Sequence, residues 1–200
     1  MTTASDQIKL VEAALANPGA ATSDFDLNPN ISLPDNRVLR DAAVLVGLMP
    51  SHDGARVVLT KRSSALKHHP GQIAFPGGKR DGDEDLTTTA LREAEEEIGL
   101  DRNKVRLIGS LPTHETVTSF QVTPHVGVID GPFDAVVEAG EVAEMFTVPL
   151  AHVLNPDNYI IEGRRWRGQR RHYFVVPYGP YYIWGATARM LRSLAEQVQQ

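Results

Sequence analysis

The stretch GKRDGDEDLTTTALREAEEEIGL, residues 78–100, constrains this chain more than any other part of it. It holds four glutamates within the five positions 93–97, and a glycine follows at position 99. Like charges one helical turn apart destabilise a helix by about 0.2–0.5 kcal/mol per pair, so the cluster needs a compensating partner. A hard divalent cation fits, because Mg²⁺ and Mn²⁺ prefer carboxylate, carbonyl and water oxygens.

The residue spacing predicts an amphipathic helix over residues 83–98, with Asp83 or Asp85 as the N-cap and Gly99 as the C-cap. At about 100° per residue, apolar residues fall on one face and three glutamates fall on the opposite face. The apolar set is Thr87, Leu91, Ala94 and Ile98, and the acidic set is Glu93, Glu96 and Glu97. We therefore expect one face to pack on a sheet and the other to present carboxylates to a cleft. The alternative is a solvated acidic face in which Arg92 pairs with Glu96.

The chain enters this helix through the turn Phe75-Pro76-Gly77-Gly78. Glycine lets the backbone approach a ligand closely, so the carbonyl of Gly77 is a further candidate metal ligand. A cation held there would polarise a phosphoryl oxygen and acidify water, and a neighbouring carboxylate would take the proton. These residues favour metal-dependent hydrolysis of a phosphoanhydride.

The remaining pattern is that of one α+β domain with a mixed sheet flanked by helices. A chain of 200 residues is long enough for a single well-packed core. Residues 1–37 are expected to form an N-terminal helix and a linker, and residues 38–200 the main domain with its C-terminal helix. Strands are expected at 42–49, 56–61, 105–111 and 121–129, a hairpin at 159–176, short helices at 138–145 and 149–154, and a closing helix at 184–198.

Composition excludes several classes of protein. The chain has no cysteine, which rules out disulfides, thiolate metal sites and cysteine nucleophiles. No stretch approaches the roughly 18 apolar residues of a membrane span, and the N-terminus does not resemble a secretory signal, so a cytoplasmic location is expected. The net charge of -5 argues against bulk nucleic-acid binding. The expected partner is a small molecule, and a homodimer is left open.

The central stretch also resembles a known motif. Gly78, five residues, Glu84, seven residues and then Arg92-Glu93-Ala94-x-Glu96-Glu97-x-Gly99-Leu100 resembles the Nudix box at every defined position. The resemblance implies the Nudix α/β/α sandwich and hydrolysis of a nucleoside diphosphate linked to another moiety, with Mg²⁺ or Mn²⁺ as the cofactor.

The same resemblance assigns roles to the box residues. It implies that Glu93, Glu96 and Glu97 are metal ligands or the general base, and that Arg92 and Glu84 orient the site. Nudix enzymes often recruit a further carboxylate from a later segment, and we expect Glu141 to serve here, with a helix cap as its alternative role. The expected catalytic set is therefore Glu93, Glu96, Arg92 and Glu141, and the expected metal set is Glu93, Glu96, Glu97 and Gly77.

The segment ahead of the box resembles the signature of the coenzyme A pyrophosphatase branch of this family. Leu59-Thr60-Lys61-Arg62-Ser63, Gly71 and Phe75-Pro76-Gly77-Gly78 match it. Val58 replaces a leucine, and Lys67 replaces an arginine, which keeps the charge but loses the two-pronged phosphate contact. The resemblance implies cleavage of coenzyme A or its thioesters to 3′,5′-ADP and (acyl-)4′-phosphopantetheine. The expected substrate-binding residues are Arg62, Lys67, Gly71, Phe75 and Gly78.

Other interpretations remain. One is a Nudix pyrophosphatase for ADP-ribose, a dinucleotide or an oxidised nucleoside triphosphate. Another is a non-catalytic Nudix module that senses a nucleotide. The predicted hairpin is also rich in arginine, and its charges are suited to a 3′-phosphate, an RNA or simply solvent. These arginines are Arg164, Arg165, Arg167, Arg170 and Arg171.

Overall fold

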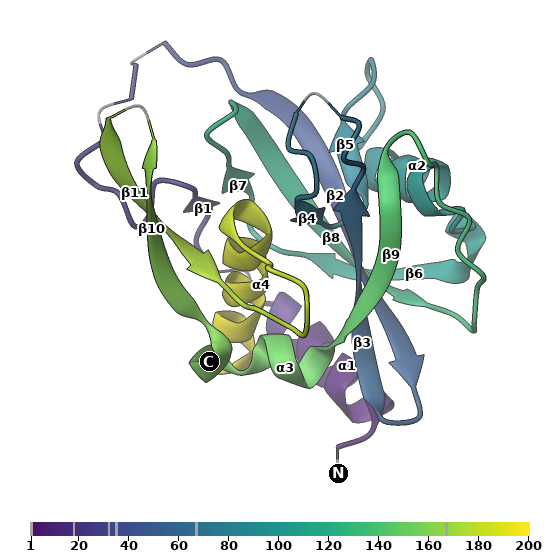
Figure 1. The fold of residues 1–200 in the computed structure, drawn as a ribbon. Coiled ribbons are helices and arrows are strands. Elements are labelled where there is room, and N and C mark those ends of the chain that lie inside the picture. Colours follow the sequence, from purple (N-terminus) through teal and green to yellow (C-terminus); the bar gives the residue numbers. More distant parts are fainter. Residues whose placement is uncertain (1, 18, 32, 35, 67, 167) are drawn as a thin grey trace.

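The computed structural model describes residues 2–17, 19–31, 33–34, 36–66, 68–166 and 168–200 (Figure 1). The helices are α1 (Ala4–Leu15), α2 (Leu86–Ile98), α3 (Leu150–Leu154) and α4 (Gly185–Val198), with 3₁₀ turns η1 (Arg102–Lys104) and η2 (Pro156–Asn158). The strands are β1 (Thr22–Ser23), β2 (Arg40–Ser51), β3 (Gly54–Arg62), β4 (Ile73–Ala74), β5 (Gly77–Lys79), β6 (Val105–Ser110), β7 (His114–Glu115), β8 (Phe120–Ile129), β9 (Val142–Pro149), β10 (Ile160–Trp166) and β11 (Gln169–Val175).

Within the described residues, the central sheet has nine strands and is mixed. Its main path runs β1-β7-β8-β2-β3-β4, and β5, β6 and β9 pair with β2, β8 and β3 respectively. Strand β2 runs parallel to β8 and antiparallel to β3, with which it forms the expected hairpin. Strands β10 and β11 form a separate two-stranded antiparallel sheet.

Helices cover both faces of the central sheet (Figure 1). On one face, Leu45 and Val58 share a core with Ala94 and Ile98 of α2. On the other face, alternate residues of β2 and β3 share a larger core with α1, α3 and α4. This explains why both strands are apolar along most of their length, since each is buried on both sides. The expected α/β/α sandwich is confirmed.

The helix expected at residues 138–145 is wrong. This segment makes a turn and then enters β9, which pairs along β3 from Arg56 to Arg62. The residues EAGEVAEM contain good helix formers, but pairing with the open edge of β3 satisfies the backbone and buries Val142 and Phe146. Tertiary pairing thus overrides local propensity.

The other elements lie close to their expected places. Helix α2 begins at Leu86, three residues later than expected, because the Asp85 side chain accepts a hydrogen bond from the backbone of Thr88 at 2.9 Å. Gly99 is its C-cap. Helix α1 buries Ile8 and Val11 in the same core as α4. Of the helices in the described ranges, none is both long enough and apolar enough to cross a membrane.

Candidate active site

The three glutamates of α2 are buried to different extents. The whole of Glu97 is 4% exposed, whereas the side chain of Glu93 is 16% exposed and that of Glu96 is 61% exposed. The predicted acidic face therefore includes one glutamate, Glu97, that is buried. Glu97 lies three residues after Ala94 and seven after Ala90, so it continues the buried ridge of the helix.

Burial and hydrogen bonding define the environment of Glu97. The backbone N–H of Gly77 donates to its Oε2 at 3.3 Å. Burial raises the pKa of Glu97 to about 7, although the Gly77 hydrogen bond and the charge of Arg62 act in the opposite direction. The charges of Glu93 and Glu141 raise this pKa further. A carboxylate in such a place is costly to ionise unless a cation accompanies it.

Glu93 sits against the glycine turn. A Cβ atom at Gly78 would lie 2.5 Å from the Glu93 carboxyl carbon, so a larger residue would displace this carboxylate. The pKa of Glu93 is raised, first by burial and then by the charges of Glu96 and Glu141, while Arg92 acts in the opposite direction. The site thus holds carboxylates that repel one another.

Arg92 gathers the neighbouring carboxylates. Its guanidinium donates to both oxygens of Glu84, at 2.8 and 3.2 Å. It also contacts Glu93 at 2.8 Å and Glu96 at 3.2 Å, and it donates to the carbonyl of Lys79 at 3.3 Å. The hydrogen bond from Arg92 is the main reason that the pKa of Glu84 falls to about 2. Arg92 therefore holds the box together, as the orienting role requires.

The glycine turn is fixed by strand pairing. Gly77 and Gly78 belong to β5 and pair with Val44 and Ala43 of β2. Gly77 has φ 154°, and a Cβ atom there would lie 2.4 Å from the carbonyl oxygen of Ala43. The turn is thereby pressed between β2 and the carboxylates of α2.

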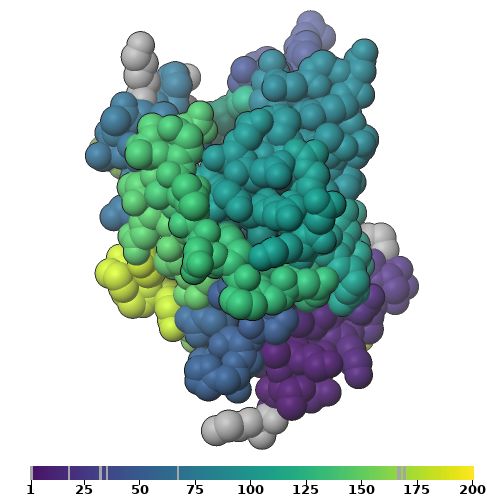
Figure 2. Space-filling model, turned by 90° about the vertical axis from the view of Figure 1, so that its right-hand side faces the viewer, coloured from purple at the N-terminus to yellow at the C-terminus, as the bar shows by residue number. Residues whose placement is uncertain are grey.

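Arg62 and Glu141 come from outside the box and lie near it. The backbone N–H of Ser63 donates to the Glu141 carbonyl at 2.8 Å, which joins the end of β3 to the turn before β9. Both side-chain charges act on Glu97. Because Glu141 lies in this turn, the helix-cap alternative is removed. In Figure 2 the teal surface around α2 borders the green surface of the segment leading into β9.

The remaining predicted substrate residues have different surroundings. The Phe75 side chain is 2% exposed and belongs to the main core, so it is not available as a contact surface. Gly71 is exposed, has φ 70°, and donates its N–H to the Arg62 carbonyl at 3.1 Å. Lys67 lies outside the described residues.

The donor set of the site suits a hard cation. Glu93, Glu96 and Glu97 offer only oxygen atoms. Burial is the main cause of the raised pKa of Glu93 and Glu97, and the charges of neighbouring carboxylates add to it. In the part of the chain that the structure describes, no three carboxylate or imidazole groups are close enough together to enclose a metal ion.

One contact near the site was not expected from the sequence. Thr187, in the first turn of α4, is 4% exposed and donates its hydroxyl to the carbonyl of Ile73 at 3.0 Å. This bond ties α4 to the strand that leads into the Phe75–Gly78 turn. The two residues are 114 positions apart, and no local pattern links them.

Comparisons with known proteins agree with this architecture. The model of the NUDIX domain family matches residues 38–166. The chain belongs to the Nudix hydrolase family. It is 41% identical over 160 residues to an uncharacterized Nudix hydrolase NudL of Enterobacter sp. (strain 638), covering 80% of this chain and 83% of the relative. A protein of the same description from Photorhabdus laumondii is 38% identical over 172 residues, covering 86% and 90%.

The Nudix fold is also found in a solved structure. The crystal structure of a MutT protein from Methanosarcina mazei Go1 has a TM-score of 0.52 and 20% identity, and covers 84% of this chain and 96% of that one. This likeness concerns the fold alone. The expected family and fold are confirmed, whereas the roles of individual residues stay predictions.

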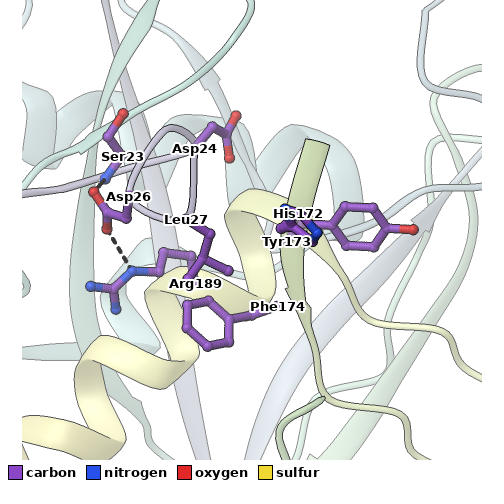
Figure 3. A pocket seen from close by; sticks show the side chains of 9 residues that line it. Ser23, Asp24, Asp26, Leu27, His172, Tyr173, Phe174 and Arg189 are labelled. Carbon is purple, nitrogen blue, oxygen red and sulfur yellow. Dashed lines mark hydrogen bonds and ion pairs between the residues drawn. The ribbon is translucent and has the colours of Figure 1, made fainter. Parts of the chain in front are cut away.

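A small pocket lies away from the box, between the segment after β1, strand β11 and the start of α4 (Figure 3). It is lined by Asp26, Leu27, Phe174 and Arg189, among others, and Arg189 Nε donates to Asp26 at 2.8 Å. Its volume of about 20 Å³ holds one or two water molecules and no nucleotide.

Proposed function

We propose that this Nudix hydrolase cleaves the diphosphate of coenzyme A or its thioesters. The products would be 3′,5′-ADP and 4′-phosphopantetheine or its acylated form. The observation that carries the proposal is the segment from Leu59 to Gly78, which resembles the coenzyme A branch in sequence and whose Arg62 lies close enough for its charge to act on Glu97. A cation beside the metal-binding carboxylates suits a substrate with several phosphate oxygens.

In this proposal Glu93, Glu96 and Glu97 hold Mg²⁺ or Mn²⁺, with the Gly77 carbonyl as a further ligand. When bound, the cation would supply polarisation of the phosphoryl oxygens and acidification of water. Gly78 lets the backbone of the turn lie directly against the Glu93 carboxylate.

The chain's own residues then position the reactants. Arg92 keeps Glu84, Glu93 and Glu96 in place. Arg62 contacts the anionic oxygens of the diphosphate. Glu141 takes the proton of the attacking water, since its side chain is exposed and, within the described residues, no cation pairs with it. The water attacks phosphorus in line, and the diphosphate bond breaks on the opposite side.

The test is to incubate the protein with coenzyme A and acetyl-coenzyme A in Mg²⁺ or Mn²⁺, and to identify the products by mass spectrometry. A parallel panel contains ADP-ribose, a dinucleotide and an oxidised nucleoside triphosphate. We expect both products from coenzyme A. Turnover of a panel compound without turnover of coenzyme A would reject the substrate. Nucleotide binding with no turnover at all would favour the sensing module.

Variants of the box test the site separately from the substrate. Glu96→Gln and Glu97→Gln remove one carboxylate charge each while keeping side-chain size, and both should abolish most turnover. Glu95→Gln is the matched control on the same helix, because Glu95 is exposed and pairs with Arg102. If turnover survives in both box variants, the assigned metal site is wrong.

A further inference from the structure

The β10–β11 hairpin concentrates positive charge. Its register places Arg164 directly opposite Arg171, and Arg165 opposite Arg170. Like charges opposite each other on neighbouring strands are destabilising. Arg164, Arg165 and Arg170 are exposed, and in the described ranges no carboxylate lies within ion-pair distance of them. Such an arrangement favours an anionic ligand.

The two faces of the hairpin have different neighbours. One face carries Phe174, which packs against two arginines of α4. The guanidinium carbons of Arg189 and Arg192 lie 5.7 and 5.3 Å from the centroid of its ring. Figure 3 shows Phe174 turned toward Leu27 and Arg189, whereas Tyr173 extends away from them. Side chains alternate along a strand and directly opposite residues share a face, so Tyr173 lies with Arg164 and Arg165 lies with Phe174.

The Tyr173 face is connected to the candidate active site. Tyr182 donates its hydroxyl to Glu162 at 2.6 Å and lies 3.4 Å from the Tyr173 hydroxyl. The adjacent Tyr181 donates to Glu144 of β9. Its ring also stacks on Phe146 of the same strand, with the ring centroids 3.5 Å apart.

Strand register places this connection beside Arg62. Glu144 pairs with Lys61 of β3, and Arg62 pairs with Val142. Arg164 lies two residues beyond Glu162, a step of about 7 Å along the strand. The C-terminal end of β10 and strand β5 also lie toward the same end of the molecule, at the top of Figure 1. A substrate whose diphosphate lies at Arg62 and Glu97 can therefore extend toward the Tyr173 face.

We propose that Arg164, on the Tyr173 face of the β10–β11 hairpin, is a specificity-determining residue that binds a phosphomonoester on the nucleoside part of the substrate. This rests on the proposed function, in which coenzyme A carries a 3′-phosphate away from the diphosphate that is cut. The guanidinium of Arg164 makes charge-assisted hydrogen bonds to this phosphate, and the exposed ring of Tyr182 lines the same face.

The test compares coenzyme A with 3′-dephospho-coenzyme A, which has the same scissile bond. The wild-type protein should prefer coenzyme A in kcat/KM by about tenfold or more, the scale of one charge-assisted contact. Arg164→Ala should remove this preference by lowering kcat/KM for coenzyme A alone. Arg164→Lys should recover part of it, because lysine keeps the charge without the planar fork. Arg165→Ala is the matched control and should change neither substrate, since Arg165 is equally charged and exposed but lies on the opposite face.

Several results would overturn the subsite while leaving the proposed function intact. The first is equal kcat/KM for both substrates in the wild-type protein. The second is an equal loss of kcat/KM on both substrates in Arg164→Ala. The third is an equal effect of Arg164→Ala and Arg165→Ala, which would indicate diffuse electrostatic attraction. If neither substrate is hydrolysed, the proposed function fails and calorimetry with adenosine 3′,5′-bisphosphate and AMP decides the subsite. Tighter binding of the bisphosphate that is lost in Arg164→Ala supports it, and equal binding refutes it.

Discussion

Replacing Glu97 by glutamine should stabilise the metal-free protein at neutral pH and above. Glu97 is 4% exposed, and burial raises its pKa from the ordinary value of 4.5 to about 7. Between these two pH values the folded state binds more protons than the unfolded state, so the free energy of unfolding falls as the pH rises. The difference between the two pKa values corresponds to about 3 kcal/mol. The stability that the protonated Glu97 carboxyl group retains is fully present below pH 4.5 and is lost as the pH passes 7.

Glutamine keeps the size of Glu97 and an oxygen that can accept from the Gly77 N–H, but it never ionises. Urea unfolding of both proteins in a chelating buffer, from pH 4 to pH 8, measures the effect. The variant and the wild-type protein should have similar free energies of unfolding at pH 4. At pH 8 the variant should be more stable by about 3 kcal/mol. Glu95→Gln, on the exposed side of α2, should show no such pH-dependent gain.

Metal binding should make the wild-type protein more stable than Glu97→Gln. Saturating Mg²⁺ stabilises whichever protein binds it, by an amount that grows with the ratio of metal concentration to Kd. We expect Mg²⁺ to raise the free energy of unfolding of the wild-type protein at pH 8 and to leave Glu97→Gln nearly unchanged. A stability difference between variant and wild type that is the same at pH 4 and pH 8 would refute the reasoning, because burial of an ionisable group predicts a pH-dependent difference.

Three further substitutions probe the surroundings of the box. Arg92→Ala should lower the free energy of unfolding by about 2 kcal/mol and reduce turnover. Arg92→Lys should recover only part of the stability and of the turnover, since lysine cannot contact both oxygens of Glu84. Full recovery with lysine would contradict this role of Arg92. Gly77→Ala should lower the free energy of unfolding by about 3 kcal/mol or more, because its Cβ atom would lie 2.4 Å from a backbone oxygen. Gly71→Ala, whose Cβ atom would have no atom within 4 Å, should lower it by about 1 kcal/mol. Equal losses in the two variants would show that close packing does not fix the turn. Thr187→Val should cost about 1 kcal/mol and speed hydrogen exchange in residues 73–79, and an unchanged exchange rate would show that this hydroxyl does not hold the turn.

Much of the fold follows from local pattern. The long apolar runs of β2 and β3 predicted buried strands. The helix expected at 83–98 starts three residues before α2 and ends at the same residue, with Gly99 as its C-cap. Residues 138–145 were predicted incorrectly because their helix-forming composition says nothing about the open edge of β3. Strand pairing between segments about 80 positions apart in the chain decides that element, and local composition does not record it.

The candidate site divides in a similar way. The spacing of Glu93, Glu96 and Glu97 predicted that the three carboxylates lie along one side of a helix. It did not predict their graded burial, because 100° steps describe angles around the helix and not the depth of the sheet beneath it. Nor did it predict that Phe75 would be buried, since a turn beside a functional loop carries no sign of which side chain points into the core.

The sequence by itself determined the motif, the helix that bears it and the family, because these depend on residue types at short fixed spacings. The tertiary structure decided which glutamate is buried, that Glu141 and Arg62 lie near it, and that the hairpin has one face toward α4 and another connected to β9. These properties depend on strand pairing and packing between distant segments. Desolvation at such contacts is what shifts the pKa of Glu97, and no spacing within residues 78–100 contains that information.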